Sequence, residues 1–360
     1  MMKLFFTKKL LRWNKKYNRR EMPWKGEKDP YKIWLSEIIL QQTRVEQGWN
    51  YYLKFINTFP SVQQLAHASD TKIFKLWEGL GYYSRCKNLI ATAKIIDKEY
   101  NGEFPDSYEK ILSLPGIGPY TAAAIASFAF NLPYAVVDGN VLRVLTRIGG
   151  IKTPADSTKG KTLLNKLALE LLDKKQPGLY NQAIMDFGAV VCKPKIPACH
   201  DCIMQKNCNA YQLELVAELP VKEKKIVKRI RWLYYFVIRY NNHVYIRKRT
   251  ARDIWQNLHE FLLVEKDSPI TKKNWLLLPP IKPLFNQSET IVTKVSKVYT
   301  QQLTHQTLHG QFIEITTDQL PDLGADFVGV AYRDLTRYPF AFPKFMITYL
   351  QEKNVNLSEQ

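Results

Sequence analysis

The sequence lacks any apolar run that approaches the roughly 18–20 residues of a membrane-spanning helix. Its first 16 residues contain only short apolar stretches, which Lys8, Lys9 and Arg12 interrupt, and no small-residue cleavage site follows them. These absences argue against a membrane span and against a secretory signal peptide. We therefore expect an intracellular protein without a membrane partner.

Acidic residues are scarce relative to basic ones. The 360 residues include 33 Asp and Glu against 52 Lys and Arg, so the formal net charge is +19 at pH 7. A hydrophobic fraction of 46% and an aromatic fraction of 12% are too high for a disordered chain. A folded chain this basic points to a polyanionic partner such as nucleic acid, and a merely basic soluble protein is the alternative.

Cysteines are few, and their number is odd. Five in an intracellular chain argue against a disulfide scaffold. Cys86 stands alone, whereas the other four form a C-x6-C-x2-C-x5-C pattern at Cys192, Cys199, Cys202 and Cys208. Four thiolates within seventeen residues can converge on one metal centre. The spacing alone leaves a structural zinc ion and an iron–sulfur cluster both open.

The hydrophobic periodicity divides the chain into two parts. A helical period runs to about residue 211, whereas a strand-like period of two begins at residue 232, with a hairpin signal at Asn241-Asn242. Lys and Arg crowd the stretch between them. We predict a mainly α domain over 1–212, a basic connector over 213–231, a smaller α+β domain over 232–350 and a tail over 351–360.

A glycine-rich turn interrupts the helical part at Leu114-Pro115-Gly116-Ile117-Gly118. Gly116 and Gly118 allow a sharp turn that exposes backbone N–H groups at the start of the following helix, where the helix dipole favours an anion. The sequence therefore predicts a helix–turn–helix that holds a phosphate without reading bases. A purely structural turn between two packed helices is the alternative.

Taken together, these motifs resemble the helix-hairpin-helix DNA glycosylases of the endonuclease III superfamily, and most closely its MutY-type adenine DNA glycosylases. The resemblance covers most of residues 5–210. It rests on the turn at 114–118, the Val-Asp-Gly-Asn-Val stretch at 137–141, the cysteine pattern, and the stretches at 22–24, 30–43 and 79–85. In that superfamily the four cysteines hold a [4Fe–4S] cluster, so the resemblance implies this cofactor in a loop over 192–208.

The resemblance also implies catalytic residues. Bifunctional members carry a Lys just after the hairpin that forms a Schiff base with the sugar, whereas this sequence has Tyr120, so a monofunctional enzyme is expected. Glu37, in an apolar helical setting, corresponds to the acid that protonates adenine, and Asp138 to the group that stabilises the sugar cation. Asn140 and Tyr120 are expected to orient them. On residue pattern alone, Glu37 fits a helix surface and Asp138 an N-cap.

A base inside a duplex must be flipped out before it can be excised. The resemblance places Gln42 and Tyr82 near the opposing base, and Gln182 in the adenine pocket. In the sequence alone, Gln42 also fits a solvated side chain, and Tyr82 also fits a core aromatic.

The C-terminal part resembles the Nudix-like domain that reads 8-oxoguanine opposite the adenine. The Trp255–Phe261 stretch matches its early segment, whereas the Glu-rich catalytic motif of Nudix hydrolases is missing. The family's Phe-Ser-His recognition loop corresponds here to Leu303, Thr304 and His305, so a hydroxyl and the His remain and the aromatic is lost.

The resemblance thus implies a monomeric enzyme of base excision repair. Its expected partner is double-stranded DNA containing A:8-oxoguanine or A:G mispairs, and its expected location is the cytoplasm of a bacterial cell, associated with the nucleoid. The alternatives are another monofunctional helix-hairpin-helix mismatch glycosylase, acting on thymine, and a non-enzymatic DNA-binding protein with a structural metal.

Overall fold

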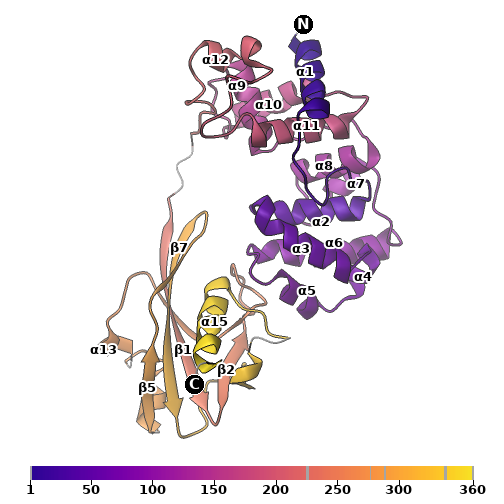
Figure 1. Cartoon of the computed structure of the whole chain (residues 1–360). Coiled ribbons are helices and arrows are strands. Elements are labelled where there is room, and N and C mark those ends of the chain that lie inside the picture. The colour runs from indigo at the N-terminus through magenta and orange to yellow at the C-terminus, as the bar shows by residue number, and fades with distance from the viewer. Residues whose placement is uncertain (1, 224–226, 276, 288, 336–338, 359–360) are drawn as a thin grey trace. The chain divides into compact units, whose positions relative to one another are not determined.

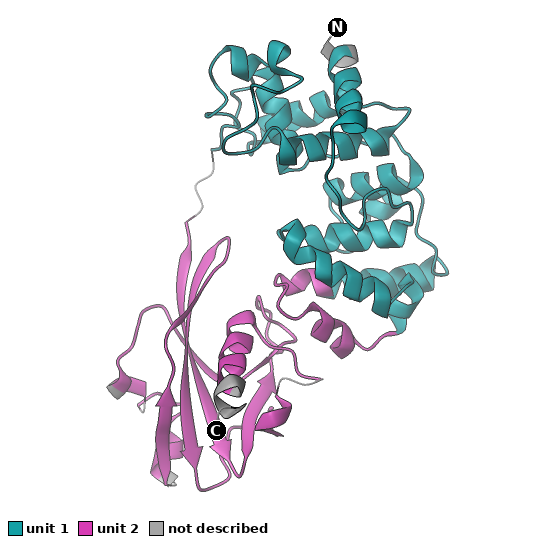
Figure 2. Cartoon of the chain, in the orientation of Figure 1, with its two compact units in different colours: residues 1–67, 87–225 teal, residues 68–86, 226–360 magenta. Residues whose placement is uncertain are grey.

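The computed structural model describes residues 2–223, 227–275, 277–287, 289–335 and 339–358. The chain forms two compact units, which Figure 2 colours separately: residues Met1–His67 with Lys87–Lys225, and residues Ala68–Cys86 with Ile226–Gln360. We call these unit 1 and unit 2. The sequence did not predict that residues 68–86 group with the C-terminal part. Across the described part of the chain, none of the helices is both long and apolar enough to span a membrane.

Unit 1 is built from helices, and Figure 1 labels its α-helices. They are α1 (Met2–Lys16), α2 (Pro30–Leu40), α3 (Val45–Thr58), α4 (Val62–His67), α7 (Tyr108–Leu112), α8 (Pro119–Phe130), α9 (Gly139–Gly149), α10 (Thr158–Leu171), α11 (Pro177–Val190), η1 (Gln205–Asn207) and α12 (Asn209–Gln212). Helix α6 (Tyr83–Glu99) begins in unit 2 and continues into unit 1, and α5 (Asp70–Trp77) belongs to unit 2.

The predicted helix–turn–helix is confirmed by α7, the turn that follows it, and α8. Gly116 has a φ of +74°, a left-handed conformation that a side chain would strain. An added Cβ there would also lie only 2.6 Å from Cβ of Asn88. Gly118 then caps α8, and Pro119 occupies its first turn, where its missing N–H has no cost.

The core of unit 1 includes a cluster made by α1, α9, α10 and α11. Trp13 of α1 meets Phe187 of α11 edge-to-face, with ring centroids 5.1 Å apart. Leu164 of α10 and Val144 of α9 are fully buried in the same cluster. Helix α11 also packs against α8 and α9, so it supports several of the elements that carry the predicted site residues.

Unit 2 contains a mixed sheet between two layers of helix. Its main strand order is β3-β2-β1-β7-β5, and β1 and β7 are parallel whereas the other pairs are antiparallel. The strands are β1 (Arg229–Tyr240), β2 (His243–Lys248), β3 (His259–Glu260), β4 (Leu262–Lys266), β5 (Thr290–Val295), β6 (Tyr299–Gln302), β7 (Gln306–Thr317) and β8 (Phe327–Ala331).

Alternation along the strands assigns one set of side chains to each face of the sheet. Tyr234 and Phe236 of β1 pack with the segment that contains α13 (Lys272–Trp275) and α14 (Lys282–Gln287). On the other face Tyr235 stacks on Phe312, and Phe312 stacks on Tyr349 of α15 (Lys344–Ser358) with centroids 4.0 Å apart. The predicted smaller α+β domain is confirmed as a fold class.

Several predicted segments of unit 2 differ in extent from the structure. The hairpin turn forms at Asn241 and Asn242, which have φ angles of 43° and 62°, as a type I′ turn requires. Strand β1 begins at residue 229, inside the predicted connector. Strand β5 ends at residue 295, and β6 starts at residue 299. Helix α15 continues to residue 358, so residues 351–358 of the predicted tail are helical.

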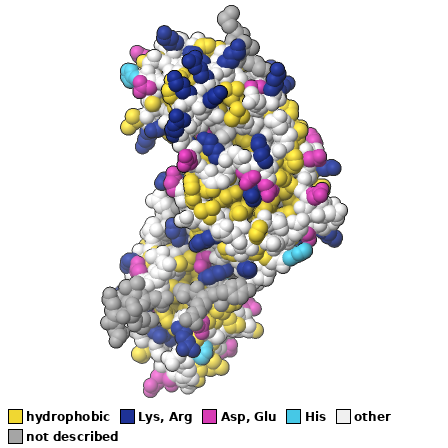
Figure 3. Space-filling view, turned by 45° about the vertical axis from the view of Figure 1, so that its right-hand side comes forward, with side chains coloured by type: hydrophobic (Ala, Val, Ile, Leu, Met, Phe, Trp, Pro, Cys, Tyr) yellow, Lys and Arg dark blue, Asp and Glu magenta, His cyan; other side chains and the backbone are white. Residues whose placement is uncertain are grey.

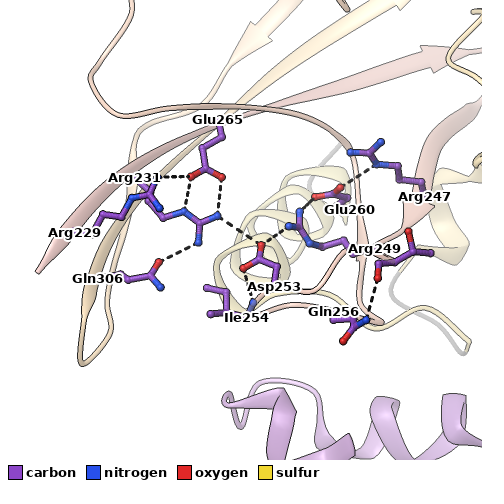
Figure 4. A network of polar contacts seen from close by, with 11 residues as sticks. Arg229, Arg231, Arg247, Arg249, Asp253, Ile254, Gln256, Glu260, Glu265 and Gln306 are labelled. Atoms are coloured by element: carbon purple, nitrogen blue, oxygen red, sulfur yellow. Dashed lines mark hydrogen bonds and ion pairs between the residues drawn. The ribbon is translucent and has the colours of Figure 1, made fainter.

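A network of arginines and carboxylates ties the early part of unit 2 together (Figure 4). Glu260 is almost fully buried and pairs with Arg247 and Arg249, and Arg249 also pairs with Asp253. Arg231 donates to both oxygens of Glu265, at 2.6 and 2.7 Å. A buried carboxylate is stable only when its charge is paired, so these arginines determine how the segment around residues 249–260 folds back on the sheet.

Candidate active site

Glu37 lies on the buried face of α2. Asp29 caps this helix by accepting the N–H of residue 31 at 2.9 Å, and Trp34 and Ile38 around Glu37 are buried. Burial raises the pKa of Glu37 to about 7 against the opposing effect of a hydrogen bond from Tyr120, and the nearby Asp138 raises it further. At neutral pH Glu37 therefore holds a proton for a substantial fraction of the time.

Asp138 is the N-cap of α9. Its Oδ1 accepts the N–H of Val141 at 2.7 Å, and its Oδ2 accepts from Nδ2 of Asn140 at 2.7 Å. Burial raises the pKa of Asp138, whereas these hydrogen bonds and the charge of Arg143 oppose the rise. The structure thus places Asp138 in the capping position that its sequence also suggested, with its carboxylate on the wall of a cavity.

Asn140 is held in turn by Arg143 of the same helix. Nη2 of Arg143 donates to Oδ1 of Asn140 at 2.9 Å, and its Nε donates to the carbonyl of Cys192 at 2.7 Å. Because the guanidinium occupies the amide oxygen, Nδ2 of Asn140 faces Asp138. A chain of hydrogen bonds therefore connects the start of the cysteine loop to the carboxylate of Asp138.

Tyr120 stands in the first turn of α8 and donates its phenol to Glu37. Burial, together with the charges of Glu37 and Asp138, raises the pKa of Tyr120 well above its usual value. The phenol is therefore a neutral hydrogen-bond donor at any physiological pH, and it cannot supply an amine.

These side chains share one cavity in unit 1, with a volume of about 440 Å³. Its lining brings together five of the residues predicted from the sequence: Glu37, Tyr120, Asp138, Asn140 and Gln182. They come from α2, α8, α9 and α11, so the site exists only when these helices pack. A cavity of this size and mixed polarity can hold a base with its sugar.

Three further polar residues belong to this site and were missed in the sequence. Arg20 and Lys25 line the cavity, and both pair with Asp186, at 2.8 and 2.9 Å. Asp186 is fully buried on α11, one turn after Gln182. The i, i+4 spacing of Gln182 and Asp186 was the available signal, since residues four apart share a helix face.

The residues of the glycine-rich turn have two roles: some shape the turn, and others expose backbone N–H groups. The side chain of Leu114 is buried, and its N–H donates to the carbonyl of Ile111 at 3.2 Å, so Leu114 shapes the turn. The space beside Gly118 is open where a Cβ would stand. Within the described residues no acceptor is found for the N–H of Gly116 or of Gly118. These two amides are therefore available at the N-terminus of α8.

Gln42 and Tyr82 are exposed residues with positive φ, at 59° and 49°. Such strain in residues other than glycine is typical of functional turns. Gln42 follows α2 in unit 1, whereas Tyr82 precedes α6 in unit 2. In unit 2 the hydroxyl of Tyr82 lies 2.7 Å from Oγ1 of Thr304, and the backbone carbonyl of His305 accepts the N–H of Arg229 at 2.9 Å. Unit 2 thus brings Tyr82 together with the turn that contains Thr304 and His305.

The four clustered cysteines line a second, mostly apolar pocket in unit 1, beside Val144, Ile148 and Phe187. All four are free thiols, and burial raises the pKa of Cys202 to about 11 and those of Cys199 and Cys208 above their usual value. In the part of the chain that the structure describes, no three ligands converge as a single metal ion requires. A multi-iron cluster bonds each sulfur to a different iron, so it does not need such convergence.

Arg147 supplies positive charge at this pocket. Its Nη1 donates to Sγ of Cys192 at 3.5 Å and to the carbonyl of Lys193 at 2.7 Å. Hydrogen bonds to sulfur and a nearby cation stabilise thiolate ligands. Four free thiols around one pocket, with a buried guanidinium beside them, therefore fit an iron–sulfur cluster by their donor chemistry.

Comparison with known proteins identifies the family of this chain. Residues 35–169 match the family described as HhH-GPD superfamily base excision DNA repair protein. The adenine DNA glycosylase of Buchnera aphidicola subsp. Baizongia pistaciae is 37% identical over 267 residues, which cover 72% of this chain and 74% of that protein. The mouse adenine DNA glycosylase is 42% identical over 216 residues, which cover 58% of this chain and 42% of its own.

Solved structures give the same class. A thermostable thymine-DNA glycosylase is 31% identical, with a TM-score of 0.54, and the match covers 59% of this chain and 97% of that one. An endonuclease III in a non-covalent DNA complex shares the fold at 18% identity, with a TM-score of 0.50 over 59% of this chain and 96% of its own. The helical unit is therefore that of the HhH-GPD base excision repair proteins.

Within this class the chain belongs to the adenine DNA glycosylase family. The resemblance that the sequence motifs suggested is thereby confirmed. The thymine-specific alternative has no better support, because the relatives matched over most of the chain carry the adenine name.

Proposed function

We propose that this protein is a monofunctional DNA glycosylase that excises adenine paired with 8-oxoguanine or guanine in duplex DNA. The observation that carries the proposal is the shared cavity in which Glu37, Tyr120 and Asp138 meet. The cavity combines a carboxyl group that is protonated near neutrality, a second carboxylate and a neutral phenol. These are the groups that purine N-glycosidic hydrolysis needs.

Glu37 acts as the general acid. It donates its proton to N7 of the adenine, so that the base leaves as a neutral molecule when the bond between N9 and C1′ breaks. A pKa of about 7 suits this role, because the acid is protonated yet releases its proton readily at working pH. Tyr120 keeps the carboxyl group oriented by its hydrogen bond.

Asp138 stabilises the positive charge that develops on the sugar when the base leaves. Its carboxylate is fixed by Val141 and Asn140, so it needs little reorganisation as that charge appears. Water then adds to C1′ and loses a proton, which leaves an abasic sugar in an unbroken strand.

The lysines of the cavity support the monofunctional assignment. Lys25 pairs with Asp186, and Nζ of Lys28 donates to the carbonyl of Phe128 at 3.0 Å. Both amines are engaged as hydrogen-bond donors, and Tyr120 occupies the slot where bifunctional relatives carry their nucleophilic Lys. No Schiff base with the sugar is therefore expected from this site.

Duplex DNA is the proposed partner of unit 1, with the protein acting as a monomer associated with the bacterial nucleoid. The N–H groups of Gly116 and Gly118 can bind a phosphate, and exposed Gln42 can reach the opposing base. On the face drawn in Figure 3, Lys and Arg side chains gather over unit 1 next to the N-terminal helix. This charge favours the DNA backbone irrespective of sequence.

Thr304 and His305 are proposed to read the opposing 8-oxoguanine, with Tyr82 as the wedge beside it. The hydrogen bond between Tyr82 and Thr304 within unit 2 supports a joint role. Leu303 supplies no aromatic face for stacking. We therefore expect a smaller preference for A:8-oxoguanine over A:G than an aromatic at that position would give.

Cys192, Cys199, Cys202 and Cys208 are proposed to hold a [4Fe–4S] cluster. When bound, the cluster ties the 192–208 loop to unit 1 as a structural cofactor. The buried thiols must lose their protons to bind it, which Arg147 favours. Iron and sulfide analysis, with visible absorbance of anaerobically purified protein, should give four of each per chain, and one zinc per chain would contradict the assignment.

A base-release assay tests the function. Duplexes carrying A opposite 8-oxoguanine, G or T, and T opposite G, are incubated with excess enzyme and divided into samples with and without alkali. We expect release of adenine opposite 8-oxoguanine and G, with strand breaks only after alkali. The Glu37→Gln and Asp138→Asn variants should bind DNA but lose excision by about 10²-fold or more.

Two outcomes would contradict the proposal. Strand breaks without alkali would show lyase activity, and excision of thymine rather than adenine would favour the mismatch enzyme. A Thr304→Ala variant serves as the matched control for unit 2. It should lower the ratio of the adenine excision rate opposite 8-oxoguanine to the rate opposite G, while the rate opposite G stays unchanged.

A further inference from the structure

Asp186 is a buried carboxylate whose two oxygens are both fully used. Oδ1 accepts from Nη1 of Arg20 at 2.8 Å and from Nε2 of Gln182 at 3.0 Å. Oδ2 accepts from Nδ2 of Asn18 at 2.7 Å and pairs with Nζ of Lys25 at 2.9 Å. An ionised carboxylate offers about four acceptor positions and no donor, so Asp186 here takes its full set of hydrogen bonds.

This arrangement determines which way the amide of Gln182 faces. A side-chain amide has an NH₂ on one side and a carbonyl oxygen on the other, and its orientation follows from its hydrogen-bond partners. Since Asp186 can only accept, Gln182 must turn its NH₂ towards Asp186. The carbonyl oxygen Oε1 is then the group that Gln182 can present to the cavity it lines.

We infer that Asp186 is a specificity-determining positioning residue, which makes Gln182 an obligate hydrogen-bond acceptor and so selects purines with an amino group at C6. N7 and the C6 substituent are neighbours on one edge of a purine. A base that receives the proton of Glu37 at N7 therefore turns its C6 substituent to the same side of the cavity. A 6-amino group donates to Oε1, whereas a 6-oxo group opposes it oxygen to oxygen.

This inference rests on the proposed adenine excision, and it explains why adenine would be selected over purines with a 6-oxo group. The two cations matter to it, because Arg20 and Lys25 both pair with the buried carboxylate of Asp186. With a neutral amide at 186, the partner of Gln182 could either donate or accept. The amide of Gln182 would then be free to turn either way.

The test compares single-turnover excision of adenine, hypoxanthine and unsubstituted purine opposite the same base. Wild type should prefer adenine to hypoxanthine. In Asp186→Asn the ratio of adenine to hypoxanthine rates should fall roughly three- to tenfold, the worth of one hydrogen bond. Unsubstituted purine has nothing at C6, so its rate should fall by less than the adenine rate.

The double variant Asp186→Asn/Gln182→Glu is the matched rescue. A carboxylate at 182 accepts in either orientation, so the adenine preference should return without Asp186. Gln182→Met keeps Asp186 and removes the acceptor, so it should also lose the preference for adenine over hypoxanthine. This variant keeps the test open if Asp186→Asn folds poorly.

Three results would overturn the inference: an unchanged ratio in Asp186→Asn, an equal loss of rate on all three bases, or failure of the double variant to restore the ratio. Failure of the proposed function itself looks different, since wild type would then release no adenine.

Discussion

At the scale of single residues, the central feature is a carboxyl group whose acidity is set by its surroundings. Glu37 in water would be fully ionised at neutral pH. Burial on α2 raises its pKa to about 7, and Tyr120 limits that rise by donating a hydrogen bond. The helix thus converts an ordinary glutamate into an acid that can donate a proton under physiological conditions.

The rate of excision should follow this protonation. Below pH 7 most Glu37 is protonated, and above it the protonated fraction falls tenfold per pH unit. Single-turnover rates at saturating enzyme should therefore be level on the acid side and decline above about pH 7. Glu37→Gln should show only a low rate without this decline. A wild-type rate that stays constant to pH 9 would contradict the role of Glu37 as acid.

The free energy of unfolding should also depend on pH, because Glu37 binds its proton more tightly in the folded state. The folded pKa of Glu37 lies above its unfolded value of 4.5, so the folded state binds more protons between pH 4.5 and 7. The free energy of unfolding should therefore decrease as pH rises through this window, by about 3 kcal/mol in total. Urea unfolding across this range measures it, and Glu37→Gln should remove that part of the slope.

The site residues differ in how far the sequence could predict them. Glu37, Tyr120 and Asp138 stand in recognisable motifs, and the structure brings them into one cavity. Arg20 and Lys25 read as two more charges in a basic chain. Their partner Asp186 lies about 160 residues further on, so the pairing appears only once α11 has packed.

At the scale of elements, the close approach of α11 to α9 deserves a direct test. A Cβ on Gly188 of α11 would lie 2.7 Å from Cβ and 2.9 Å from the carbonyl oxygen of Asn140. Gly188→Ala must therefore push the two helices apart and displace the hydrogen bond between Asn140 and Asp138. We expect a loss of about 1–3 kcal/mol in stability and a lower excision rate.

Gly139→Ala is the matched control for this substitution. Gly139 lies at the start of α9, and an added Cβ there meets nothing within 4 Å. Thermal unfolding of both variants provides the measurement. If Gly188→Ala and Gly139→Ala had equal melting temperatures, the close packing of α11 on α9 would not matter as argued.

Elements whose own residues require a particular backbone conformation could be predicted from the sequence. Elements whose extent or grouping depends on the rest of the fold could not. The glycine-rich turn and the Asn241-Asn242 hairpin carry their own conformational requirements, and both are found where expected. The end of α15 has no such signal, and the helix continues to residue 358, beyond the predicted domain boundary at residue 350. Likewise, nothing local in residues 68–86 indicates that they group with unit 2.

At the scale of the whole molecule, the net charge of +19 predicts how DNA binding responds to salt. Each phosphate contact releases counterions, so the binding constant should fall linearly with salt on a double-logarithmic plot. Between 50 and 200 mM we expect a loss on the order of 10³-fold or more for undamaged duplex. Fluorescence anisotropy measures it.

The excision step should be nearly independent of salt once the duplex is bound. Its proposed determinants, Glu37 and Asp138, line the cavity, where mobile ions screen weakly. Single-turnover rates at saturating enzyme provide this comparison. A rate constant that fell as steeply as affinity would mean that exposed charges, rather than Glu37 and Asp138 in the cavity, control the chemistry.

The proposed role of Tyr120, whose side chain has no amine, has a consequence for the product that the enzyme leaves. The sugar left after excision keeps a masked aldehyde and a backbone that breaks readily in alkali. Without an amine to trap that aldehyde, the proposed reaction ends with a fragile abasic lesion. The next reaction must therefore be cleavage of the strand at an abasic site by another enzyme, and a slow departure of this one would shield the lesion until then.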